Sequence, residues 1–175
     1  MRRALGWFLY GLTTLCMVLL LLCCRGVFLP CGCARSEVIE LDDKSLTLVL
    51  AENSFSVRDG SDLLWQTESF LHIQDFLTLD IDRDGQTELM LLAWRRGNYG
   101  SSRPFWVERN DTRWSQHIFI YKWQGDAPVP QWMSSRLRPE VDAWAARDGS
   151  QLFILTPEGE QTLWQWGNWG LVRVD

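Results

Sequence analysis

Cysteine is missing from most of this chain. All five cysteines of the 175 residues lie within the first 33 positions, at Cys16, Cys23, Cys24, Cys31 and Cys33. The remaining residues therefore contain no disulfide framework. A structural zinc site is not expected either, because Cys31-Gly32-Cys33 has no second pair of Cys or His ligands nearby.

Basic charge and histidine are also scarce. From residue 26 onward the chain has 14 basic and 22 acidic side chains, a net charge of −8. A domain this acidic lacks the basic surface that binds nucleic acid, so we exclude nucleic acid as a partner. There are only 2 histidines, and no Ser-His-Asp order, nucleophile elbow or phosphate loop is present. We therefore assign no catalytic residues and do not expect an enzyme.

One long hydrophobic run is present, at the N-terminus. Residues 4–24 (ALGWFLYGLTTLCMVLLLLCC) carry no charge, Arg2 and Arg3 precede them, and Arg25 follows. This length matches the roughly 20 apolar residues of a transmembrane helix. The leading arginines favour an N-terminus in the cytoplasm, which predicts a single-pass cell-membrane protein with an extracytoplasmic C-terminal domain. A cleaved signal peptide and lipidation at Cys33 remain alternatives.

The residue pattern of the rest of the chain is typical of a β protein. We expect residues 1–30 to be the anchor or signal segment, residues 31–45 a polar tether, and residues 46–175 the folded domain. Beyond the tether, short runs rich in β-branched and aromatic residues alternate with Asp-Gly, Pro and Gly. Such runs are typical of strands, and no helical period is sustained among them. The sequence therefore predicts an all-β domain of antiparallel meander sheets.

A degenerate repeat runs through this domain. Asp-Gly occurs at Asp59-Gly60, Asp84-Gly85 and Asp148-Gly149, each time between strand-like runs. Asp-Gly supplies the positive-φ positions of hairpin turns. Repeats of this kind suggest the blades of a β-propeller, but the length allows only two to three blade-like units, whereas a closed propeller needs roughly 4–8. We therefore expect a partial propeller, either left open or completed by self-association or a partner.

The strongest motif is the segment 80–88, DIDRDGQTE. Asp80, Asp82 and Asp84 alternate, Gly85 allows a sharp turn, and Glu88 follows at the ninth position. Alternate positions of a tight loop point inward together, and calcium takes six to eight oxygen ligands of this hard type. An EF-hand would require a glutamate at the twelfth position, where this chain has an apolar leucine. A solvated acidic hairpin without metal is the alternative interpretation.

Residues 76–89 resemble the core of an FG-GAP or VCBS repeat, and residues 57–65 are similar to the strand-turn-strand that often precedes it. These calcium-loop repeats build integrin-α-like β-propellers and many bacterial surface proteins. The resemblance implies a Ca²⁺ cofactor bound between two strands. It assigns the metal ligands by position in this chain: Asp80, Asp82, Asp84, Glu88 and the carbonyl of Gln86.

Residues 95–116 form a long segment with little strand pattern, and long loops in compact domains are often functional. Its aromatic residues, among them Tyr99, Trp106 and Trp114, lie among charged ones and suit a glycan, peptide or lipid headgroup. The alternative is that they cover a sheet edge. Glu108 and Asp111 of the same loop could form a glycosidase pair.

Three functions are therefore compared. The favoured one is a membrane-tethered extracytoplasmic β-repeat domain that binds calcium and serves as a binding or scaffold module for a protein or glycan. The others are a surface carbohydrate-active hydrolase that uses the 95–116 loop, and a structural subunit that needs a partner to close its sheets.

Overall fold

The computed structural model describes residues 2–24, 28–30, 32–41, 44–97, 105, 108 and 112–174. For residues 2–10 and 24 it describes the backbone alone. The chain divides into two compact units, Met1–Pro30 and Cys31–Asp175. The first unit contains helix α1 (Arg2–Cys24). Within the described part of the chain, we find no helix that combines the length and apolar character needed to cross a bilayer.

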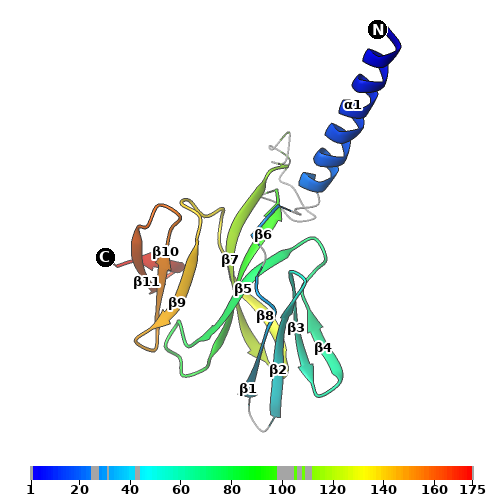
Figure 1. The fold of residues 1–175 in the computed structure, drawn as a ribbon. Helices are drawn as coiled ribbons and strands as arrows, with labels where there is room; N and C mark the ends of the chain where they lie inside the picture. Colours follow the sequence, from blue (N-terminus) through cyan, green and yellow to red (C-terminus); the bar gives the residue numbers. More distant parts are fainter. Residues whose placement is uncertain are drawn as a thin grey trace. The chain divides into compact units, whose positions relative to one another are not determined.

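The second unit is built from strands, which confirms the all-β antiparallel prediction. The strands form three four-stranded sheets, and within each sheet consecutive strands are hydrogen-bonded neighbours (Figure 1). The first sheet contains β1 (Arg35–Leu41), β2 (Lys44–Ala51), β3 (Ser54–Asp59) and β4 (Asp62–Gln66). The second contains β5 (His72–Leu79), β6 (Glu88–Arg96), β7 (Trp114–Gln124) and β8 (Ala127–Met133). The third contains β9 (Ala143–Arg147), β10 (Gln151–Leu155), β11 (Gln161–Gly167) and β12 (Gly170–Arg173).

The first sheet begins earlier than the sequence suggested. Residues 31–45 were expected to be a tether, but Arg35–Leu41 forms β1 and pairs along its whole length with β2. The physical reason is an alternation that the charged residues of this segment make hard to recognise: Ile39 and Leu41 pack against the core, while Val38 and Glu40 are exposed.

The central sheet is covered on both faces, as Figure 1 shows for β5–β8 between the other two sheets. Leu89, Leu91 and Ala93 of β6 join a cluster with residues of the first sheet, such as Leu48. Their neighbours on β6, for example Leu92, join a second cluster with residues of the third sheet. Successive strand residues point to opposite faces, so an unbroken apolar run is what a doubly covered strand requires. The β domain is therefore a stack of three sheets with two cores.

His117 of β7 is a buried titratable group in this central sheet. Its Nε2 lies 2.9 Å from the hydroxyl of Ser115, and its Nδ1 lies 3.1 Å from the carbonyl of Ser134. Burial lowers the pKa of His117, the Ser134 carbonyl opposes this shift, and the positive charges of Arg95 and Arg136 add to it.

This lowered pKa predicts a loss of stability in acid. The unfolded histidine takes up a proton below about pH 6.5 while the folded one resists it, so stability is present above that pH and falls below it. Between pH 7.5 and 5.5 the contribution lost is at most about 1.4 kcal/mol. Urea unfolding of wild type and His117→Gln at both pH values measures it: the decline should be smaller in the variant. Equal declines would contradict the assignment.

Candidate metal centre

The candidate centre is the loop that joins β5 to β6. Asp80 follows the last residue of β5, Glu88 is the first residue of β6, and Leu79 pairs with Glu88 across the two strands. Gly85 has φ +89° and Arg83 has φ +63°. Glycine adopts such angles without the steric cost that a side chain would bring, so it permits the reversal in the middle of the loop. The two strands thus bring both ends of the DIDRDGQTE segment together.

Main-chain N–H groups orient the loop carboxylates. Gly85 N donates to Asp80 Oδ2 at 3.1 Å, and Asp84 N donates to Asp82 Oδ1 at 3.2 Å. Gln86 N donates to Asp84 Oδ1 at 2.9 Å, and Ile81 N donates to Glu88 Oε2 at 2.9 Å. Each of the four acidic side chains therefore has one oxygen bound to the main chain, which leaves its second oxygen for other partners.

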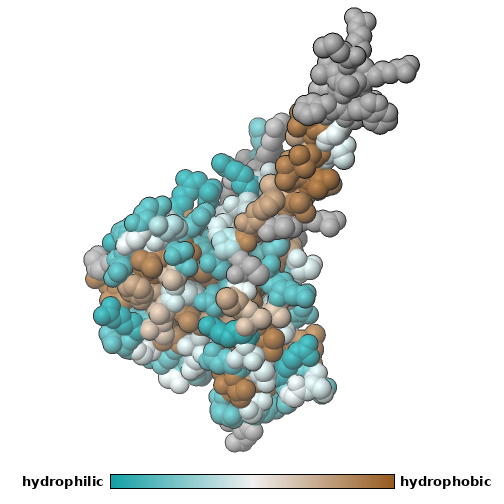
Figure 2. All heavy atoms as spheres, in the orientation of Figure 1, coloured by the Kyte–Doolittle hydropathy of each residue, from teal (hydrophilic) through white to brown (hydrophobic). Residues whose placement is uncertain are grey.

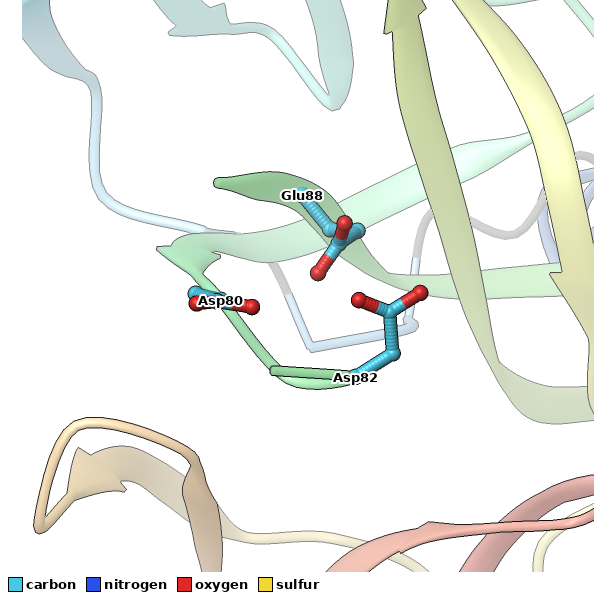
Figure 3. Close-up of side chains that lie close together, drawn as sticks. All are labelled: Asp80, Asp82 and Glu88. Carbon is cyan, nitrogen blue, oxygen red and sulfur yellow. The ribbon is translucent and has the colours of Figure 1, made fainter. Parts of the chain in front are cut away.

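Asp80, Asp82 and Glu88 form an acidic cluster that could hold a metal ion. One oxygen from each carboxylate lies within 4.8 Å of the others. Figure 3 shows the three side chains facing a common space, with Glu88 on the strand and the two aspartates on the loop. Glu88 is fully buried. Glu88 Oε1 and Asp80 Oδ1 are both shielded from solvent and have no hydrogen-bond partner.

Two further side chains reach the cluster from neighbouring strands. The ammonium of Lys122 on β7 lies 2.8 Å from Asp82 Oδ2 and 3.9 Å from Glu88 Oε1, and it also contacts Asp84 Oδ2. Gln131 on β8 donates from Nε2 to Asp82 Oδ2 at 2.8 Å. Both oxygens of Asp82 therefore accept hydrogen bonds, whereas Asp80 Oδ1 and Glu88 Oε1 accept none.

Sequence reasoning missed both Lys122 and Gln131. Tyr121 pairs with Leu89, and this register places the next residue, Lys122, beside Glu88. The register between β7 and β8 shifts between Ile120 and Tyr121, and Gln131 lies on β8 at this shift. The only signal in the sequence is a lysine directly after the apolar run IFIY, and it becomes informative only once the strand pairing is known.

The electrostatics of the cluster follow from burial and from Lys122. Burial, together with the nearby negative charge of Asp82, raises the pKa of Glu88 to about 7. The hydrogen bonds that Lys122 donates to Asp82 and Asp84 raise its pKa, so the amine stays protonated. The hydrogen bond from Lys122, followed by that from Gln86 N, lowers the pKa of Asp84. One ammonium thus faces four carboxylates, which leaves an excess of negative charge.

The other predicted ligands lie at the edge of this arrangement. Asp84 is exposed and its free oxygen is taken by Lys122, while Gln86 is exposed and contributes its N–H to Asp84. Arg83, between the aspartates, donates from Nε to Ser150 Oγ at 2.9 Å, which connects the loop to the turn between β9 and β10. The loop is thus held by contacts with both the second and the third sheet.

The aromatic residues assigned to the 95–116 loop are only partly described. Tyr99 and Trp106 lie outside the described residues, as does Asp111. Trp114 is half-buried at the start of β7, where its ring packs edge-on against His72 with centroids 4.8 Å apart. Glu108 is exposed. This packing favours the alternative that Trp114 covers the sheet rather than binding a ligand.

Comparison with known proteins gives no match: no family model, no curated protein and no solved structure is similar to this chain.

Proposed function

We propose that this chain is a membrane-tethered, extracytoplasmic β-repeat module whose 80–88 loop binds calcium. The observation that carries the metal assignment is the pair of buried carboxylate oxygens, Glu88 Oε1 and Asp80 Oδ1, which have no hydrogen-bond partner within a cluster of negative charge. A buried carboxylate oxygen without a hydrogen bond is costly, and a cation bound between these oxygens removes that cost.

The donor set favours calcium among common metals. Every side chain in the cluster offers oxygen, and the described residues place no histidine or cysteine among them. Calcium accepts many oxygen ligands in flexible geometry, whereas zinc prefers nitrogen and sulfur. Asp80, Asp82 and Glu88 would hold the ion, with Asp84 and the carbonyl of Gln86 as further candidates from the FG-GAP resemblance. Bound calcium would supply positive charge that fixes the loop between β5 and β6.

The repeat part of the proposal is supported by the three consecutive four-stranded sheets. Each sheet is an up-and-down meander, which is the form of a propeller blade. We infer that the module is a partial propeller of three blade-like units, serving as a binding or scaffold surface for a protein or glycan.

The membrane part of the proposal is supported by the uncharged run of residues 4–24 and its flanking arginines. In the described part of α1 large apolar side chains such as Leu15, Met17 and Leu20 are exposed. Figure 2 shows the coloured part of this helix as a largely hydrophobic surface. An exposed surface of this kind is favourable only in contact with an apolar phase or a partner.

Calcium titration tests the metal assignment. We expect the full-length chain in mild detergent to bind one calcium ion with a dissociation constant on the order of 0.1–1 mM, as extracellular modules do. Glu88→Gln should weaken binding at least about tenfold, because it removes the charge of a central ligand. Asp59→Asn is the matched control, since it alters another Asp-Gly turn outside the cluster. Calorimetry that detects no binding by wild type would overturn the assignment.

A C-terminal reporter tests the topology. Because Arg2 and Arg3 favour a cytoplasmic N-terminus, a fusion to a protein that is fluorescent only in the cytoplasm should be dark, and a fusion to a periplasmic phosphatase should be active. Moving the two arginines to the other side of the run is the control and should reverse both signals. A bright cytoplasmic reporter on the unaltered chain would contradict the topology.

A further inference from the structure

Lys122 already occupies part of the candidate calcium centre. Its ammonium contacts Asp82 Oδ2 at 2.8 Å and also contacts Asp84, while Glu88 Oε1 lies 3.9 Å away. A metal ion bound through Asp82 Oδ2 would need the same oxygen that Lys122 and Gln131 now share. Two positive charges cannot both approach this carboxylate closely without strong repulsion.

We propose that Lys122 is a built-in competitor of calcium: its ammonium stabilises the metal-free loop, and calcium binds by displacing it from Asp82. This inference rests on the proposed calcium site. Asp80 and Glu88 would provide the first contacts, because Asp80 Oδ1 and Glu88 Oε1 have no hydrogen bond that must break. Asp82 would join only after Lys122 leaves.

The chemistry of lysine suits this role. The chain has 15 arginines and only 2 lysines, Lys44 and Lys122. One of these two lysines is the residue that contacts the acidic cluster. An ammonium is a compact point charge on a flexible stem, whereas a guanidinium is a planar fork that fixes carboxylates in pairs. The side chain of Lys122 is one-third exposed, so its ammonium has a route to solvent when the metal arrives.

The competition makes the loop a calcium sensor of limited affinity. In the metal-free state the ammonium offsets part of the charge of the four carboxylates and holds the loop in shape. Calcium therefore binds a loop that is already folded, but it must break the ion pairs of Lys122. The released ammonium would carry a positive charge from the loop to the surface of the central sheet.

Calcium titration of the full-length chain in detergent tests this inference. Lys122→Met keeps the apolar stem but removes the charge, and it should bind calcium about tenfold more tightly than wild type, since the partly exposed ion pairs with Asp82 and Asp84 no longer have to break. Lys122→Arg keeps the charge and should bind no more tightly than wild type. Lys44→Met changes the net charge equally, but Lys44 pairs with Asp126 at 2.6 Å, so it should leave the affinity unchanged.

The outcomes separate the two proposals. Equal calcium affinity of wild type and Lys122→Met, or weaker binding by the variant, would overturn the competitor role while leaving the calcium site in place. Failure of both chains to bind calcium would overturn the site and this inference together. Binding by Lys122→Met alone would overturn the proposed displacement, because calcium would then not bind the natural chain.

Amine labelling of the unaltered chain provides a second readout that does not depend on a folded variant. With 2 lysines in the sequence, acylation at Lys122 can be measured by mass spectrometry relative to Lys44. Ion pairing protects an amine by keeping it protonated, so saturating calcium should increase labelling of Lys122 at least about threefold and leave Lys44 unchanged. Unchanged or decreased labelling of Lys122 in the presence of bound calcium would overturn the displacement.

Discussion

Calcium at about 1 mM is expected to raise the melting midpoint of this chain by about 3–6 °C. With a dissociation constant of about 0.1 mM, binding to the folded state alone adds RT ln(1 + 10), roughly 1.4 kcal/mol. For a domain of this size, each kcal/mol shifts the midpoint by roughly 2–4 °C. Differential scanning fluorimetry in calcium and in chelator measures the difference. Magnesium should have a much smaller effect, because it demands octahedral geometry and dehydrates reluctantly.

The cluster residues decide whether this shift comes from the 80–88 loop. Asp82→Asn should abolish most of the difference between calcium and chelator, since it weakens a central ligand and one partner of Lys122. Asp59→Asn, at the turn between β3 and β4, should preserve the full shift. Melting curves of wild type that coincide in calcium and chelator would favour the solvated hairpin held by Lys122 instead.

A pair of alanine substitutions in β6 is expected to have the largest effects on stability. Leu91 is fully buried in the cluster shared with the first sheet, and Leu92, 1% exposed, lies in the cluster shared with the third. Removing a buried leucine side chain costs about 2–5 kcal/mol. Leu91→Ala and Leu92→Ala should therefore each lower the free energy of unfolding by about that amount, as measured by urea denaturation.

These neighbours form a matched pair, because they share a strand and a residue type but point to opposite faces. In a two-layer sheet only one of them would be buried, and the other would behave as a surface residue with an effect of about 0.5 kcal/mol. Leu63→Ala, at a position 50% exposed on β4, provides that surface reference. A small effect of either β6 substitution would contradict the three-sheet stack.

The β class could be predicted from local patterns, and the sheet stacking could not. Leu46, Leu48 and Leu50 alternate with more exposed residues, a pattern that predicts a strand with one buried face. The run from Leu89 to Trp94 also predicts a strand, but only the structure shows which sheet covers each face. Residues 35–41 fall within the predicted tether, residues 31–45, because the charged side chains around Ile39 and Leu41 make their alternation hard to recognise.

In the candidate centre, too, some residues could be predicted from the sequence and others could not. Asp80, Asp82 and Glu88 lie within one short segment, so their convergence could be anticipated from loop geometry alone. Lys122 and Gln131 come from two other strands, and their position depends on strand register, which a single sequence does not determine. The sequence therefore indicates the convergence of these three carboxylates, but not the ammonium that offsets part of their charge.

Anomalous diffraction from crystals grown in calcium would test the central claim most directly. Long-wavelength data locate calcium independently of the refined side chains. We expect an anomalous peak between the carboxylates of Asp80, Asp82 and Glu88, with the Lys122 ammonium moved away from Asp82. No peak at this position at about 10 mM calcium, roughly tenfold or more above the expected dissociation constant, would contradict the calcium centre.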